Sequence, residues 1–166
     1  MFKVGDLIVY AEHGICRIDD ITDQTFSGIT REYYILHPIK NDQNLTISVP
    51  VNIKNSSMQN IMDKDEAEEI LEIMETEEVE WIDKLQDRNR QYTKMVNSGD
   101  RKEIAQVART LIKKKREIEE EGKKFPENDR TLLETIEDIL FEEIAIALDT
   151  SPENIYKRIE NMIFNH

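Results

Sequence analysis

The sequence predicts an α+β protein in two parts, a small β domain over residues 1–60 and an all-α bundle of four to five helices over residues 61–166. Short apolar runs separated by turn residues fill the first part, which is typical of strands. After residue 60 only two glycines and two prolines occur, and apolar residues recur at helical spacing. With 166 residues, 39% of them hydrophobic, the chain has enough apolar material for packed cores.

The β part contains four apolar runs and a possible fifth strand. Leu45, Ile47 and Val49 alternate with polar residues, as in a half-buried strand, and Pro50 ends or bends that strand before Val51 and Ile53. The other runs cover residues 4–10, 15–21 and 33–36, with turn signals at Gly5-Asp6, His13-Gly14, Ser27-Gly28 and Asn41-Asp42. Four or five such short strands favour a small barrel over a flat sheet.

The α part begins with an acidic connecting helix over residues 61–75, in which Ile70, Leu71 and Met74 lie at helical spacing. Trp81, Leu85 and Tyr92 share a second helical stripe. The break at residues 98–100 separates that stripe from the next helix.

The remaining helices carry recognisable end signals. Asp100 is suited to cap the third helix, which Gly122 ends. Pro126 then opens a helix as its first residue, with a wide apolar face extending to Leu148. Ser151 and Pro152 are typical of the cap and first position of a last helix.

The charge is unevenly distributed along the chain, whose net charge is −13. Residues 1–60 carry −2, residues 61–83 carry −10, residues 84–130 carry +5 and residues 131–166 carry −6. A duplex repels a polyanion, so the whole-chain charge opposes simple nucleic-acid binding, whereas the basic segment between two acidic ones could support a local contact.

Several classes of protein are excluded by what the sequence lacks. No apolar run is long enough for a membrane span, and the N-terminus lacks the apolar stretch of a secretory signal, so we expect a cytoplasmic protein. Cys16 is the single cysteine, and we expect it in the core. The three histidines are scattered, and no zinc spacing, phosphate loop or nucleophile elbow occurs. We therefore expect neither catalytic residues nor a metal or other cofactor.

The N-terminal part resembles the CarD/CdnL family. The resemblance rests on Phe2-Lys3-Val4-Gly5-Asp6, Ile8-Val9-Tyr10, His13-Gly14-Ile15, Tyr33–Leu36 and Leu45–Val51. The same module is the polymerase-interacting domain of the transcription-repair coupling factor. The second part resembles the family through Trp81, Ser98-Gly99-Asp100 and the stretch from Asp129 to Ala145.

The resemblance implies a Tudor-like, SH3-like barrel that binds the β subunit of bacterial RNA polymerase. It further implies a helical domain that contacts promoter DNA at the upstream edge of the transcription bubble. Such a protein changes open-complex stability without catalysis, and nothing in the sequence demands more than a monomer.

The resemblance also suggests where the polymerase would contact the barrel. The family uses the region after its second strand and the strand before Pro50. The candidates in this sequence are Phe26, Arg31, Thr46, Ser48 and Pro50. Gln24 and Ser48 stand where some members carry basic residues, which predicts either a matching change in the polymerase or a lower affinity.

The implied DNA contacts centre on Trp81, because the family places a tryptophan against the minor groove at the bubble edge. Two alternatives stay open: Trp81 is a core anchor, or Leu85, one turn later, takes the groove position. The basic candidates beside them are Lys84, Arg88, Arg90, Arg101 and Lys102. The run Lys113–Arg116 points all round its helix and is better explained as a solvated helix end.

These observations leave two functions of different classes. In the first, the helical domain touches promoter DNA while the barrel holds the polymerase. In the second, the chain is a protein–protein adaptor whose acidic helical domain does not contact DNA. The first requires Trp81, Arg88 or Arg90 on an exposed basic face, and the second requires that face to be acidic or buried.

Overall fold

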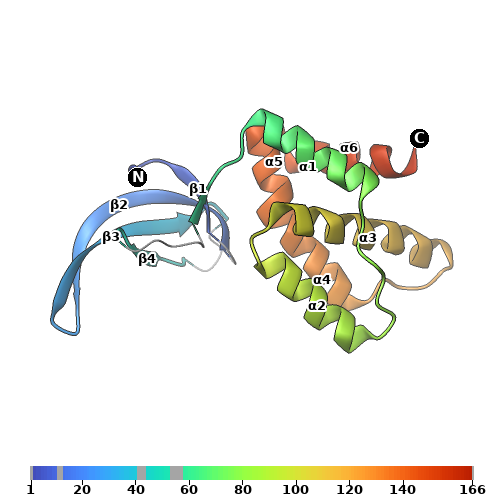
Figure 1. Cartoon of the computed structure of the whole chain (residues 1–166), viewed down its shortest axis with the longest axis horizontal. Helices are drawn as coiled ribbons and strands as arrows, with labels where there is room; N and C mark the ends of the chain where they lie inside the picture. The colour runs from blue at the N-terminus through green and yellow to red at the C-terminus, as the bar shows by residue number, and fades with distance from the viewer. Residues whose placement is uncertain (1, 11–12, 41–43, 53–57, 166) are drawn as a thin grey trace. The chain divides into compact units, whose positions relative to one another are not determined.

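The structure is a computed structural model that describes residues 2–10, 13–40, 44–52 and 58–165. The chain divides into two compact units, Met1–Ile61 and Met62–His166. Among the described elements, the strands lie in the first unit and the α-helices in the second (Figure 1). The predicted α+β fold, with strands first and a helical bundle second, is confirmed.

The first unit is an antiparallel sheet of five strands in the order β4-β3-β2-β1-β5. The strands are β1 (Leu7–Tyr10), β2 (Gly14–Phe26), β3 (Ile29–Pro38), β4 (Ile47–Pro50) and β5 (Met58–Asn60). In the described residues the pairing ends at β4 on one side and β5 on the other. The strands form one curved antiparallel sheet, which agrees with the predicted small β domain. The expected strand residue Ile53 lies outside the described residues, and the sequence did not predict β5.

The hairpin of β2 and β3 is the longest element of the sheet (Figure 1). Ser27 and Gly28 connect its strands with φ of 51° and 77°, the left-handed pair that a two-residue turn of this twist requires. A bulge between Ile18 and Asp20 shifts the register once and increases the local twist.

One face of the sheet forms the core of this unit. Ile8, Cys16, Ile18 and Leu36 are fully buried there, and Tyr34 and Val49 are nearly so. Burial raises the pKa of the Cys16 thiol to about 11. The expectation that Cys16 is a core residue is confirmed.

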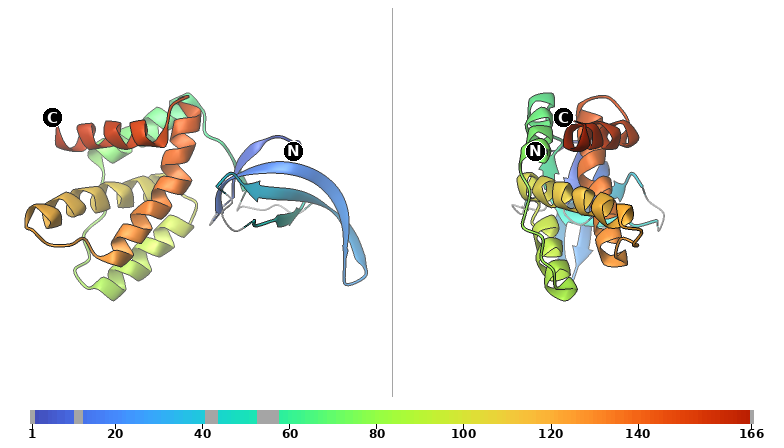
Figure 2. Two further views of the ribbon diagram at one scale, coloured as in Figure 1. Left: turned by 180° about the vertical axis from the view of Figure 1, so that it is seen from behind. Right: turned by 90° about the vertical axis from the view of Figure 1, so that its right-hand side faces the viewer.

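The second unit contains five helices in residues 62–165 (Figure 2). They are α1 (Lys64–Thr76), α2 (Leu85–Asn97), α3 (Arg101–Glu120), a continuous helix made of α4 (Glu127–Ile136), the π-helical turn η2 (Glu137–Phe141) and α5 (Glu142–Ala147), and α6 (Pro152–Phe164). Figures 1 and 2 show α1 and α6 side by side, and Arg158 on α6 pairs with Glu68 on α1.

The helix ends follow the sequence signals with two exceptions. Asp100 accepts hydrogen bonds from the backbone N–H groups of Lys102 and Glu103, and Ser151 caps α6 in the same way. Gly122, with a φ of 78°, follows the end of α3. Pro126 is the residue before α4 and not its first residue. Trp81 was expected on a helix, but it precedes α2, in the segment that joins α1 to α2.

The acidic first helix is part of the bundle and not a solvated connector. Ala67, Ile70, Leu71 and Met74 of α1 are buried in a single core with residues of every other helix. Burying each large aliphatic side chain contributes about 1.5–3 kcal/mol, so an exposed α1 would forfeit much of the stability of the bundle. Asp65, Glu68, Glu69 and Glu72 of α1 are exposed, whereas the half-buried Glu66 pairs with Arg101.

Cys16 provides a test of the sheet core. At pH 8 the fraction of thiolate is about one in a thousand for a pKa of about 11, and the side chain is fully buried. We expect iodoacetamide to alkylate Cys16 at a rate limited by opening of the sheet, as measured by mass spectrometry of timed samples. A urea-unfolded sample should react at the rate of a free thiol. Equally rapid labelling of the folded protein would contradict this packing.

Candidate functional site

The five candidate polymerase contacts of the β unit share one face of the sheet. In the β2–β3 and β3–β4 ladders, Gln24 pairs with Arg31, Phe26 with Ile29, Ser48 with Ile35 and Pro50 with Tyr33. Side chains alternate along a strand, and opposite partners share a face. Phe26, Arg31, Ser48 and Pro50 therefore lie on the face opposite to the core, and Thr46, two residues before Ser48, joins them. We call this surface the outer sheet face.

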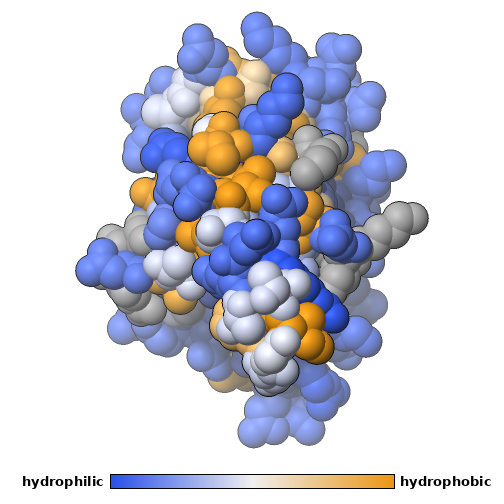
Figure 3. Space-filling view, turned by 90° about the vertical axis from the view of Figure 1, so that its left-hand side faces the viewer, coloured by the Kyte–Doolittle hydropathy of each residue, from blue (hydrophilic) through white to orange (hydrophobic). Residues whose placement is uncertain are grey.

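The outer sheet face exposes apolar side chains. Phe26 and Ile29 at the end of the hairpin are 53% and 54% exposed, and the Phe26 ring contacts Tyr33 edge-on at 5.3 Å between centroids. Figure 3 looks toward the end of the hairpin and shows apolar groups among polar ones at the surface. An apolar cluster at the surface, rimmed by polar residues such as Arg31, is typical of a protein-binding surface.

Polar contacts of His37 with Asp19 and Thr46 fix the start of strand β4. His37 Nδ1 lies 2.5 Å from Asp19 Oδ2, and His37 Nε2 lies 3.1 Å from Thr46 Oγ1. This chain of contacts ties Thr46 to β3 and to the bulge of β2. Among the described strands β4 is the last on this side of the sheet, and a strand in that position can pair with a strand of another protein.

Trp81 is the centre of the second candidate surface, in the helical unit. The side chain is half-buried, with its ring centroid 6.4 Å from that of Tyr92. The guanidinium carbon of Arg88 lies 4.1 Å from the Trp81 ring centroid, and Lys114 Nζ lies 5.4 Å from it. Such stacking is favourable and restricts the ring to one orientation. Trp81 is thus both packed against the bundle and partly open to solvent.

Hydrogen bonds from side chains of α2 and α3 to backbone groups hold the segment that carries Trp81. The Val79 N–H donates to Thr110 Oγ1 at 2.9 Å, and the Thr110 hydroxyl donates back to the Val79 carbonyl at 2.9 Å. The Tyr92 hydroxyl donates to the Glu80 carbonyl at 2.6 Å. The residues just before Trp81 are therefore fixed by side chains of α2 and α3.

Arg88 differs from the expectation for a phosphate contact. It is 3% exposed, and its Nε and Nη2 donate to the two carboxylate oxygens of Asp129, at 2.9 and 2.6 Å. Its Nη1 donates to the carbonyls of Ile82 and Asp83. Because these bonds use all three nitrogens and the group is buried, Arg88 supports Trp81 from inside and does not offer its charge to a phosphate.

Arg101 also has an internal carboxylate partner. Its guanidinium donates to both oxygens of Glu143, at 3.0 and 2.6 Å, and Glu143 accepts the Met62 N–H at 2.8 Å. Burial raises the pKa of Glu143, while Arg101 and the Met62 N–H act in the opposite direction. Arg101 is thereby committed to joining α3, α5 and the start of α1.

The remaining DNA-contact candidates are not gathered in one place. Lys84 and Leu85 are exposed beside Trp81, and Leu85 is 42% exposed. Arg90 is exposed and pairs with Asp87 at 3.1 Å. Lys102, like Arg101, begins α3 at the other end of α2, about 20 Å along the helix axis.

Sequence reasoning overlooked Lys114 as a neighbour of Trp81. The run Lys113–Arg116 does point around the helix, as predicted. Lys113 pairs with Glu78, Lys114 approaches Trp81 and Glu117, and Arg116 stacks on Phe164. Only the packing of the 79–81 segment along α3 brings Lys114 to the tryptophan, and no local pattern indicates it.

The fold defines a two-module protein, a β-sheet unit followed by a helical unit. Residues 2–62 match the family model described as the CarD-like/TRCF RID domain, and residues 69–160 match the one described as CarD, C-terminal domain. The chain belongs to the CarD family of transcription regulators, a non-enzymatic family, and contains its RNA polymerase-interacting domain.

A curated relative covers almost the same length. The chain is 25% identical over 156 residues to "Putative transcription factor YdeB" of Bacillus subtilis (strain 168), an alignment that covers 93% of this chain and 97% of that protein. None of the described helices is long and apolar enough to cross a membrane. Within the described residues, no group of three or more His, Cys, Asp or Glu side chains is arranged to hold a metal ion.

The Arg88–Asp129 contact predicts that substitutions of the two residues have strongly non-additive effects on the free energy of unfolding. Removing either partner alone leaves a buried charge without its counter-ion, so Arg88→Met and Asp129→Leu should each cost about 3–5 kcal/mol. The double variant should lose much less than the sum. Urea unfolding followed by Trp81 fluorescence measures all four free energies. Additive losses would contradict a direct pair, and Arg90→Met, which removes an exposed arginine, should change stability by less than about 0.5 kcal/mol.

Proposed function

We propose that the outer sheet face binds the β subunit of RNA polymerase, and that the helical unit contacts promoter DNA at the upstream edge of the transcription bubble through the surface around Trp81. Binding there would change the stability of the open complex. The observation that carries the proposal is the convergence of Phe26, Arg31, Thr46, Ser48 and Pro50 on one exposed face of a domain that interacts with RNA polymerase.

The geometry supports polymerase binding in two ways. The exposed Phe26 and Ile29 supply apolar area for burial, and β4, the last of the described strands on its side, could pair with a strand of the partner. Arg31 lies directly across the ladder from Gln24 and on the same face. It can therefore supply a positive charge next to the place where some family members carry one.

The support for DNA contact is the exposure of part of Trp81 between cations. Lys114 and Lys84 are positive charges that a phosphate could approach there. The buried Arg88 stacks on the Trp81 ring. A partly open aromatic ring in a fixed orientation suits stacking against an unstacked base step. Leu85 offers an alternative apolar contact one turn later.

The second candidate function, a protein–protein adaptor, is favoured by the commitment of Arg88 and Arg101 to internal carboxylates. The helical unit is otherwise strongly acidic, since its three segments carry −10, +5 and −6. An acidic surface of this kind could bind a basic protein and keep away from DNA.

The polymerase-binding proposal predicts that Phe26→Asp weakens binding to the polymerase β subunit at least tenfold. The substitution places a carboxylate in the apolar part of the contact. Val4→Asp is the matched control, because Val4 is an equally exposed apolar residue of the same unit (57%). Biolayer interferometry with immobilised polymerase gives both affinities. Equal losses in the two variants would place the contact elsewhere.

The DNA-contact proposal predicts that the wild-type protein lengthens the lifetime of the open complex and that Trp81→Ala abolishes the effect while retaining polymerase binding. A contact worth ~1.4 kcal/mol more in the open complex changes its equilibrium about tenfold. Filter binding after a competitor challenge measures the lifetime.

Two further variants separate the alternatives. An effect that survives Trp81→Ala but is lost in Leu85→Ala would move the contact to Leu85. Lys94→Ala, which removes an exposed lysine further along α2, should behave like the wild type. An unchanged lifetime with wild-type protein bound to polymerase would favour the adaptor.

A further inference from the structure

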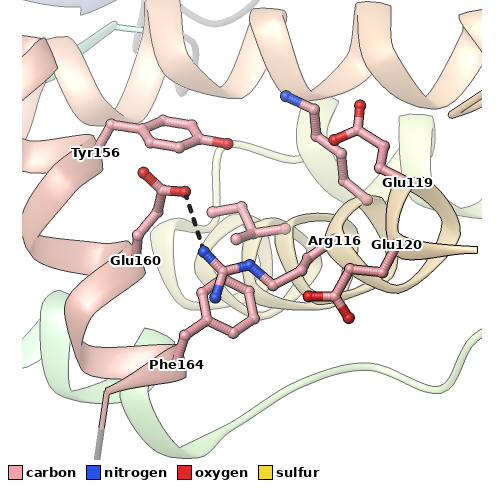
Figure 4. A pocket seen from close by; sticks show the side chains of 8 residues that line it. Arg116, Glu119, Glu120, Tyr156, Glu160 and Phe164 are labelled. Carbon is pink, nitrogen blue, oxygen red and sulfur yellow. Dashed lines mark ion pairs between the residues drawn. The ribbon is translucent and has the colours of Figure 1, made fainter. Parts of the chain in front are cut away.

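The C-terminal halves of α3 and α6 line a cavity of about 360 Å³ that is open to solvent (Figure 4). The proposed polymerase and DNA contacts do not use it. Ile112, Arg116 and Glu119 line it from α3, and Tyr156, Glu160 and Phe164 line it from α6. Its volume is within the range of small-molecule sites.

The floor of the cavity includes apolar and aromatic side chains. Ile112 is 2% exposed, and the Tyr156 ring packs against the buried Phe141 with centroids 5.9 Å apart. The Arg116 guanidinium carbon lies 3.6 Å from the Phe164 ring centroid. The cavity thus already accommodates one organic cation of the protein itself on an aromatic wall.

Carboxylates lie on two sides of this floor. In Figure 4 Glu160 is on one side, and Glu119 and Glu120 are on the other. The Arg116–Glu160 pair has its nearest N–O distance at 3.9 Å, longer than a hydrogen bond. Among the described residues, Glu119 and Glu120 take part in no ion pair. Glu160 and these two glutamates can therefore accept hydrogen bonds from a ligand.

Three carboxylates and two cations line the cavity, a net negative charge that favours a positive ligand. Both α3 and α6 end here, and neither has a basic residue in its last turn to offset the negative end of the helix dipole. Two of these carboxylates also act on the hydroxyl of Tyr156. Its pKa is raised to about 12, first by burial and then by Glu137, Glu160 and Glu119, against the opposing effect of Arg116.

We propose that this cavity binds a linear aliphatic polyamine. The methylene segments would lie on Ile112, Tyr156 and Phe164, and the ammonium groups would reach Glu160 at one side and Glu119 and Glu120 at the other. In such a ligand the ammonium groups are separated by methylene chains. In the cavity the carboxylates are likewise separated by apolar side chains. Binding would join the C-terminal ends of α3 and α6.

The charged residues of the wall decide between a cationic and an anionic ligand. Lys115 and Arg116 also line the cavity, and an anion would depend on them. For a polyamine, Arg116 is instead a competitor for Glu160. Removing its charge must strengthen polyamine binding and weaken anion binding, so the two ligand classes predict opposite signs.

The test is a titration of the full-length protein with spermidine at constant ionic strength, followed by ¹H–¹⁵N correlation spectra. We expect saturable shifts concentrated in residues 112–120 and 156–164. Glu160→Gln should weaken the affinity about two- to fivefold, the range for loss of one partly exposed ion pair. Arg116→Gln should strengthen it by a similar factor.

Matched variants control for the net charge of −13, which attracts any polycation. Glu153→Gln and Lys157→Gln change the charge by the same amounts at exposed positions of α6 that do not line the cavity, and each should leave the affinity unchanged. Equal effects of Glu160→Gln and Glu153→Gln, shifts spread along α1, or weaker binding by Arg116→Gln would overturn the proposal. Magnesium chloride, which has no alkyl chain, should produce no saturable shifts at these residues.

Discussion

The buried ion pair of Arg88 and Asp129 is the interaction on which the geometry of the helical unit depends. One guanidinium binds the carboxylate of α4 in a bidentate manner, donates to two carbonyls of the 82–83 segment and stacks its face on Trp81. Its burial carries a desolvation cost that only complete hydrogen bonding can offset. Because any shift of α2, α4 or the tryptophan segment would break part of that set, the pair specifies one arrangement of all three.

The same device recurs at the other end of the bundle. Arg101 binds the buried carboxylate of Glu143, which in turn accepts the N–H of Met62, so α3, α5 and the entry to α1 meet at one carboxylate. Buried apolar residues from all the helices fill the space between the two pairs. The apolar core supplies most of the stability. Apolar contacts alone would allow several relative positions of the helices, and the two ion pairs favour one of them.

Local signals in the sequence were sufficient for the fold class, the helix caps at Asp100 and Ser151 and the buried position of Cys16. Each depends on residues a few positions apart. The roles of Arg88 and Arg101 could not be predicted in this way, because their partners lie 41 and 42 residues further along the chain. A basic residue on a predicted helix looks the same whether it faces solvent or a distant carboxylate. The position of Lys114 could not be predicted either, because only the packing of α3 brings it to Trp81, which is distant in the sequence.

The commitment of two arginines to the interior also limits how strongly the helical unit could bind DNA by itself. Non-specific affinity for DNA depends on cations that can neutralise phosphates, and an acidic unit with few free cations has little of it. A contact centred on Trp81 could therefore act only when the sheet unit is already attached to a partner at the promoter. Attachment raises the local concentration of the helical unit, so a weak contact becomes sufficient. The weakness of the free unit then confers specificity, because the protein would avoid bulk DNA and respond only to promoter complexes that present the right surface.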